Sequence, residues 1–304
     1  MNNKILSWML HIMVGVFAFF FFLVLFFPFE TLVRYFLSQV EIQSKGAYKI
    51  NVGEIDPSFF FKTSLKDFEL VLSKPTGDVV LLKTPELKIG VSYLPLLASH
   101  VDASFELKSK KGGMEGNMFL SQTMQRFDVD LNQMDFAEFP LLAGWLKIPL
   151  SGEINGNIMA EIYPEQVGKN EGEINLKLKD LKIAAGKMDL YQGFELEIPD
   201  TVLSANDPAV LKATLSKGRL DVKELNIPGP DMALKAAGRV QINRKLSFAH
   251  LSVNGSFQFS QKLQEVLSIL VLIEKQKNEQ GWYPFNLSGQ VSRPKLQVGT
   301  IQVL

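Results

Sequence analysis

Residues 172–183 read GEINLKLKDLKI, and this stretch decides the fold. Its apolar residues Ile174, Leu176 and Leu178 are separated by single polar residues. That period of two is typical of a β-strand with one face toward water and the other toward an apolar interior. Strands buried on both faces, as in parallel sheets, would instead read as continuous apolar runs. The stretch therefore predicts an antiparallel sheet.

The last six residues of this stretch belong to a phrase that recurs along the chain, as LKDFEL (65–70), LKDLKI (178–183) and loosely VKELNI (222–227). In the first copy Leu65 and Phe68 have opposite parity in a regular strand. They can share a face only if the chain is kinked, or one residue is bulged out, near Asp67. We expect each copy to mark the start of a strand, with an apolar anchor, a kink or bulge at the acid, and then the alternating segment.

Clean alternation also appears elsewhere, in VDASFELK (101–108), FDVDL (127–131), FELEI (194–198) and LSVNG (251–255). Turn sequences separate these segments, at 73–78, 108–113, 165–172, 204–208 and 228–231. Turns every 10 to 15 residues between one-sided strands favour an antiparallel meander. Glycines 152, 172, 238, 255 and 289 each begin a phrase of the form Gly-x-apolar-x, which is typical of places where a sheet bends.

The first 29 residues form the first of three predicted regions. No charge occurs from Ile5 to Phe29, and a helix of that length measures about 37 Å, enough to cross a hydrocarbon core of about 30 Å. The run ends in FFPFETLVRYF without the small residues of a cleavage site, so we expect an uncleaved single-pass anchor. The positive charges on the two sides of the run do not decide its orientation, but with only four residues before it we expect this anchor to leave the body outside the cytoplasm.

The second region is a membrane-proximal amphipathic helix over 30–47, and the third is a β domain over 48–304. Apolar residues of the helix fall on one face, namely Leu32, Val33, Phe36, Leu37 and Val40. Within the β domain one long helix is expected at 260–280, with Leu267 and Leu270 in its apolar stripe. The predicted fold class is mainly β: an N-terminal single-pass transmembrane helix followed by a curved antiparallel β-groove or sandwich with a few helices.

Composition and motifs argue against catalysis. Thirty-two basic residues balance thirty-two acidic ones, which disfavours nucleic acid as a partner, and the chain has no cysteine. No phosphate-binding loop, serine-nucleophile elbow or zinc-binding HExxH occurs. Asp128, Asp130 and Asn132 resemble the start of a calcium loop, but the glycine and glutamate it needs are absent, so a solvated strand face explains them. We predict no catalytic, metal or cofactor site, and a protein that is not an enzyme.

The apolar strand faces must be covered by something. A second sheet or the 260–280 helix would make a closed core, whereas an open groove would accept lipid acyl chains. One helix is too small to cover the apolar faces of so many strands. The residues expected on this face are Phe68, Leu70, Phe105, Leu107, Ile174, Leu176, Leu178, Phe194, Leu196, Ile198, Leu251, Val253, Leu267 and Leu270.

The order of several phrases carries a family resemblance. An apolar anchor precedes GEIDPSFFFKTSLKDFELVL (53–72), LPLLASHVDASFELKSKKGGMEGNM (94–118), FPLLAGWLKIPLSGEINGNI (139–158) and WYPFNLSGQVSRPKLQV (282–298). Across nearly the whole chain this order resembles the type II secretion system protein N (GspN) family, within the wider AsmA-like group of anchored envelope proteins. The resemblance implies a bacterial inner-membrane protein with a curved β body in the periplasm.

Two functions follow from that resemblance, of which we predict the first and keep the second as the alternative. The narrower family implies a non-enzymatic component of the type II protein secretion system, with other secretion components as partners. The wider group implies lipid binding or lipid transfer in the envelope. Neither brings a catalytic motif to carry onto this chain.

Overall fold

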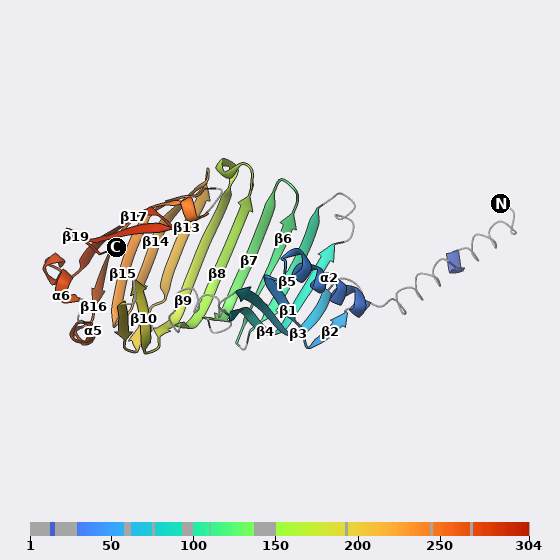
Figure 1. Cartoon of the computed structure of the whole chain (residues 1–304), viewed down its shortest axis with the longest axis horizontal. Coiled ribbons are helices and arrows are strands. Elements are labelled where there is room, and N and C mark those ends of the chain that lie inside the picture. The colour runs from blue at the N-terminus through green and yellow to red at the C-terminus, as the bar shows by residue number, and fades with distance from the viewer. Residues whose placement is uncertain are drawn as a thin grey trace.

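A computed structural model describes residues 13–15, 29–57, 62–74, 77–92, 100–109, 111–136, 150–191, 194–243, 246–267 and 270–303. The described chain is mainly β, as predicted, and nearly all of its strands belong to one large sheet (Figure 1). The strands of its first half are β1 (Tyr48–Asn51), β2 (Glu54–Pro57), β3 (Lys62–Lys74), β4 (Gly77–Ser92), β5 (Val101–Lys108), β6 (Gly113–Leu120), β7 (Gln125–Asp135), β8 (Leu150–Ile162) and β9 (Glu171–Ile183). The strands of its second half are β12 (Thr201–Val202), β13 (Ala209–Ser216), β14 (Arg219–Pro228), β15 (Met232–Gln241), β16 (His250–Phe259), β17 (Tyr283–Gln290), β18 (Arg293–Val298) and β19 (Ile301–Gln302).

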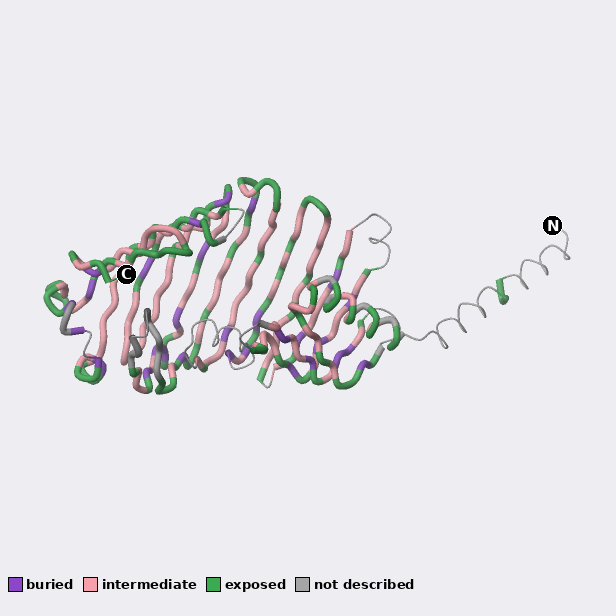
Figure 2. Tube along the Cα trace, in the orientation of Figure 1, coloured by how far each residue is buried: buried purple, intermediate pink, exposed green. Residues whose placement is uncertain are grey.

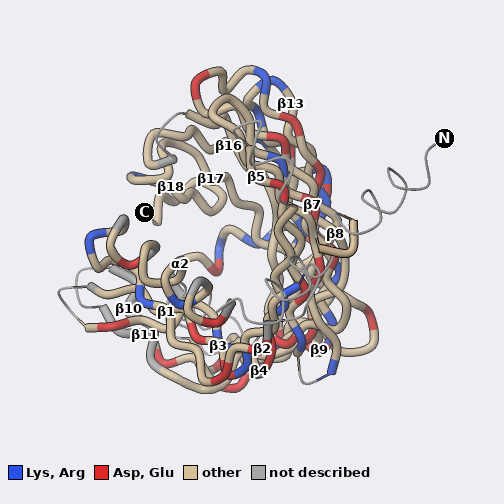
Figure 3. Tube along the Cα trace, turned by 90° about the vertical axis from the view of Figure 1, so that its right-hand side faces the viewer, with Lys and Arg blue, Asp and Glu red and all other residues tan. Residues whose placement is uncertain are grey.

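The sheet is an antiparallel meander. From β3 to β9 and from β13 to β19 each strand pairs with the next along the chain, and β9 pairs with β13 across the one interruption. The interruption holds β12 and a separate two-stranded sheet of β10 (Gly186–Tyr191) and β11 (Phe194–Ile198). All five predicted turns fall between strands. Seen end-on, the sheet curves into a C-shaped section (Figure 3).

Both ends of the sheet are finished by short strands. At the first edge β1 and β2 lie one after the other along β3. At the last edge β19 pairs only with Gln297 and Val298 of β18, and Val303 N–H donates to the Leu296 carbonyl at 2.7 Å. Pro294 has no N–H to offer a further strand. The last edge is therefore a poor template for strand addition.

The predicted kink at the recurring phrase is confirmed. Asp67 has a φ of +50°, in the left-handed region that Asp tolerates better than most residues, and Leu65 and Phe68 on either side of it are both buried. In the second copy Asp180 also has a φ of +50°, and the extra residue of a true bulge lies opposite Gly152. The kink or bulge at this position thus lets both flanking apolar residues face the interior.

A bulge between two apolar residues of one strand occurs at two more places. In the loose copy, Val222 and Leu225 flank a bulge that has no left-handed residue. A further bulge separates Leu131 from Met134, where Gln133 has a φ of +48°. The bulge at Gln133 was not predicted, because a glutamine stands where the other copies carry an acid.

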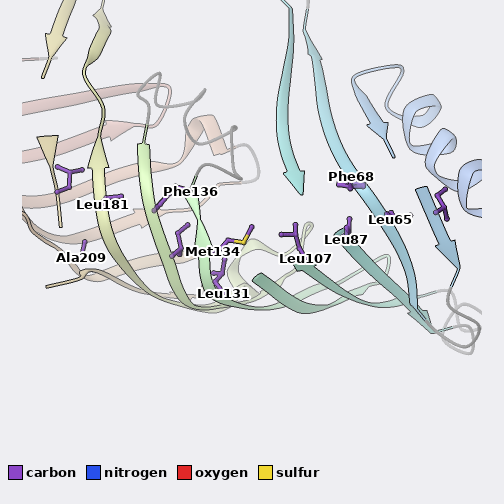
Figure 4. Packing of buried hydrophobic residues seen from close by; sticks show 12 residues of the cluster. Leu65, Phe68, Leu87, Leu107, Leu131, Met134, Phe136, Leu181 and Ala209 are labelled. Atoms are coloured by element: carbon purple, nitrogen blue, oxygen red, sulfur yellow. The ribbon is translucent and has the colours of Figure 1, made fainter. Parts of the chain in front are cut away.

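The main hydrophobic core runs along one end of the strands of the first half of the sheet. Its members occupy successive strands, on the inner side of the curve, and Leu65 and Leu107 are each only 1% exposed (Figure 4). The buried cluster consists of Ile55, Leu65, Phe68, Leu87, Leu107, Leu131, Met134, Phe136, Ile154, Leu181, Leu203 and Ala209. Toward the middle of the strands, burial gives way to partial exposure (Figure 2).

The amphipathic helix is present as α2 (Phe29–Gln43), against β1 and β2. Val33 and Leu37 pack on the main core; the side chains of Leu32, Phe36 and Val40 lie outside the described set. The predicted span, except for residues 13–15 and Phe29, also lies outside the described residues. Among the residues that are described, no helix is long and apolar enough to cross a membrane.

The prediction of one long helix at 260–280 is wrong. The segment forms α5 (Gln261–Val266), α6 (Leu270–Ile273) and the 3₁₀ turn η4 (Glu274–Gln276). The apolar residues of α5 and α6 are nevertheless buried together in one cluster.

The left-handed residue in the first phrase yields a stability prediction. Asp67→Val should lower the free energy of unfolding by about 1–2 kcal/mol, because a β-branched side chain is strained at positive φ. Asp67→Gly should stay within about 1 kcal/mol of the parent, since glycine adopts this conformation freely. Denaturant midpoints measure both.

Asp102→Val is the matched control, because Asp102 is equally exposed on β5 but not at positive φ. It should change stability by about 0.5 kcal/mol or less. Equal losses for Asp67→Val and Asp67→Gly would show that backbone strain is not the cause.

Candidate functional site

The candidate site is the apolar side of the large sheet, which we call the inner face. Strand register aligns its residues into rows that cross the sheet. The first row contains Leu65, Leu87, Leu107, Met114, Leu131, Gly156, Leu176, Leu211, Leu225, Ala236, Gly255, Phe285 and Val298. From β3 to β18 it extends about 60 Å along the curve, at about 4.8 Å per strand.

Two further rows run beside the first. The second contains Ile89, Phe105, Gly116, Val129, Ile158, Ile174, Ala213, Val222, Gly238, Val253, Leu287 and Leu296. The third contains Val91, Ala103, Met118, Phe127, Ala160, Gly172, Leu215, Leu220, Val240, Leu251, Gly289 and Pro294. None of these residues is charged, and none has a polar side chain.

Partial exposure distinguishes most of the inner face from a closed core. In the second row Ala213 alone is buried, and large side chains such as Ile158, Ile174 and Val253 remain partly exposed. In the first row Leu107 is buried but Leu176, four strands away, is partly exposed. A second sheet or a covering helix would have buried these side chains completely.

Glycines on the inner face make room for aromatic rings of the neighbouring strand. Phe105 pairs with Gly116, and a Cβ added to that glycine would lie 2.8 Å from the Phe105 ring. Phe285 pairs with Gly255 in the same way, with a separation of 2.7 Å. The rings thus occupy the space that a side chain at each paired glycine would fill.

The opposite side of the sheet is polar and carries ion pairs between neighbouring strands. Lys212 Nζ lies 2.9 Å from Glu224, and Arg239 Nε lies 3.3 Å from Asp221. Asp128 and Asp130 are exposed on this side, as the strand-face interpretation predicts. The described residues contain no group of acidic and histidine side chains that could hold a metal ion.

A second cluster covers the inner face near its last edge. Leu263, Leu267, Leu270 and Ile273 from the short helices pack with Tyr283 and Val298. Tyr283 is fully buried and stacks on Phe257 at 5.2 Å between ring centroids. We call this unit, residues 260–283, the C-terminal cap.

Polar contacts fix the C-terminal cap. The Tyr283 hydroxyl donates to Glu274 at 2.9 Å, and Lys277 Nζ donates to the same carboxylate at 2.7 Å and to Gln264 at 2.8 Å. The hydrogen bond from Lys277, and after it the one from Tyr283, hold the pKa of Glu274 below its usual range. Burial raises the pKa of Tyr283, which stays a neutral donor.

The structure brings most of the predicted face residues together. Leu107, Ile174, Leu176, Phe105, Leu251 and Val253 lie in the three rows, while Phe68, Leu70 and Leu178 lie beside the first row in or against the main core. Leu267 and Leu270 are buried in the C-terminal cap rather than on a sheet.

Phe194, Leu196 and Ile198 do not belong to the rows. They lie in β11, which pairs with β10 outside the large sheet, although its alternation looks like that of any other strand. Ile198 is partly exposed, and the side chains of Phe194 and Leu196 are outside the described set. Periodicity identifies a strand but carries no information about which sheet it joins.

No protein-family model matches the chain. No curated protein and no solved structure matches it either.

The difference in burial along the first row predicts different responses to the same substitution. Leu107→Asp should lower the free energy of unfolding by several kcal/mol, because the carboxylate would be buried without a partner. Leu176→Asp should cost about 1 kcal/mol, because water reaches that position. Denaturant midpoints of the two variants give the comparison.

Lys177→Ser is the control for strand parity, since Lys177 lies on the polar side next to Leu176. It should change stability by about 0.5 kcal/mol or less. A loss for Leu176→Asp as large as that for Leu107→Asp would mean that the inner face is closed.

The carboxylate of the C-terminal cap gives a pH prediction. A carboxyl with a lowered pKa in the folded state adds stability above its ordinary pKa, and this contribution is lost as the pH falls through the lowered value. Glu274→Gln should therefore be less stable than the parent at pH 7, and the difference should shrink below about pH 4.5. Thermal unfolding across pH 3–7 tests this, and a constant difference would contradict the role of the charge.

Proposed function

We propose that this protein is a non-enzymatic, membrane-anchored component of the bacterial envelope whose curved sheet binds hydrocarbon chains along its inner face. The observation that carries the proposal is the partial exposure of most residues in the second and third apolar rows, and of Leu176 and its neighbours in the first. Contiguous exposed apolar surface of this extent is uncommon on a protein that has no hydrophobic ligand or partner.

The chemistry of the rows favours hydrocarbon over other ligands. Backbone N–H and C=O groups within the sheet are used by neighbouring strands, and the side chains in the rows offer no hydrogen bond. A peptide or a sugar would bury its own polar groups there without partners, at a cost of about 1–3 kcal/mol for each. An acyl chain has no such groups, and it gains about 0.8 kcal/mol for each methylene removed from water.

A role in type II secretion is the second candidate, and the order of sequence phrases from 53–72 to 282–298 supports it. The two candidates are compatible, because a secretion component could use an apolar sheet to contact lipid. In this proposal the body lies in the periplasm, anchored in the inner membrane by one helix.

Binding of a fluorescent fatty acid tests the ligand. The full-length protein in detergent-free nanodiscs should enhance its fluorescence, and Leu176→Asp should weaken binding at least severalfold by placing a charge on the inner face. Lys177→Asp introduces the same residue on the polar side and should bind like the parent. Equal binding by both variants, or none by the parent, would refute the proposal.

Deletion of the gene separates the two candidates. A secretion component predicts that exoproteins accumulate in the periplasm while the lipid composition of the outer membrane stays normal. A lipid-transfer protein predicts the opposite pair of outcomes.

A further inference from the structure

Helix α2 carries large side chains on two opposite sides, and the outward side also holds the exposed Thr31 and Ser38. Val33 and Leu37 face the main core, where they pack on buried residues of the sheet. Tyr35 and Ile42 are 57% and 65% exposed. At 3.6 residues per turn these two side chains lie on the opposite side of the helix from Val33 and Leu37, roughly 170° away.

The outward side of a helix packed on a sheet is ordinarily polar. A single exposed apolar residue would need no explanation. Tyr35 and Ile42, however, are separated by two turns, about 10 Å along one side of the helix. Tyr48, shortly after the helix, is a third large residue that is 41% exposed.

The position of α2 in the chain indicates what covers this side. The uncharged run from Ile5 ends at Phe29, where α2 begins, so a membrane span there delivers the helix directly to the bilayer surface. Tyrosine, with an apolar ring and a polar hydroxyl, is enriched at that interface. Glu30 and Arg34 pair at 2.9 Å, so this flank of the helix adds little net charge.

We infer that α2 lies on the lipid surface as an interfacial helix, with Tyr35 and Ile42 in contact with lipid and Val33 and Leu37 holding the sheet. The β1–β3 end of the inner face is then fixed at the membrane surface, instead of standing away from it on a stalk. The inference rests on the proposed membrane anchor and adds a second, lateral contact to it.

The absence of cysteine makes a direct test practicable. Single-cysteine variants Tyr35→Cys, Ile42→Cys and Asn206→Cys of the full-length protein are labelled with an environment-sensitive fluorophore and reconstituted into phosphatidylcholine vesicles. Half of the vesicles contain brominated acyl chains, which quench a fluorophore that contacts lipid. Asn206 is the control, because it is exposed in the turn between β12 and β13, far along the chain from α2.

The labels at positions 35 and 42 should be quenched severalfold more by brominated lipid than the label at position 206. Equal quenching at all three positions, with the protein retained in carbonate-washed membranes, would overturn the lateral contact while leaving the anchor intact. Disulfide-linked dimers of Tyr35→Cys would also overturn it, by assigning this side of α2 to a second copy. Release of the protein by carbonate would refute the anchor itself.

Discussion

One constraint shapes the whole molecule: an antiparallel meander has one apolar side, and this side must stay in register across every strand. A shift by a single residue would turn all apolar side chains of a strand outward. The chain meets the constraint because apolar residues of neighbouring strands pair with one another: Ile158 pairs with Ile174, and Leu176 pairs with Leu211. The three rows, the main core and the curvature all depend on this alignment.

The sequence predicts this architecture well because its signals are local. Alternation around Leu176 identifies both the strand and its apolar side, and the parity conflict between Leu65 and Phe68 indicates the kink at Asp67. Gln133 shows the limit of such reasoning, since the same backbone conformation occurs there without the expected acid. The kink is predicted by the spacing of the flanking apolar residues and not by the acid between them.

The errors concern tertiary context. The segment 260–280 has helical periodicity, but it forms the short elements α5, α6 and η4, whose apolar residues are buried together on Tyr283. The strand β11 has the same pattern as its neighbours and yet pairs away from them. Alternation also does not predict whether a position is buried, because Leu107 and Leu176 have the same sequence pattern but Leu107 is buried and Leu176 is partly exposed.

The pairing of each strand with its neighbour in the chain also bears on how the protein folds. In a meander the partner of a new strand has just been synthesised, so most loops to be closed are short and their entropic cost is small. Two steps have much longer connections: the step from β9 to β13, where β10 to β12 intervene, and the step from β16 to β17, where the C-terminal cap intervenes. The strands of the first half of the sheet can therefore pair one after another. The second half joins the sheet only after β13 has paired with β9.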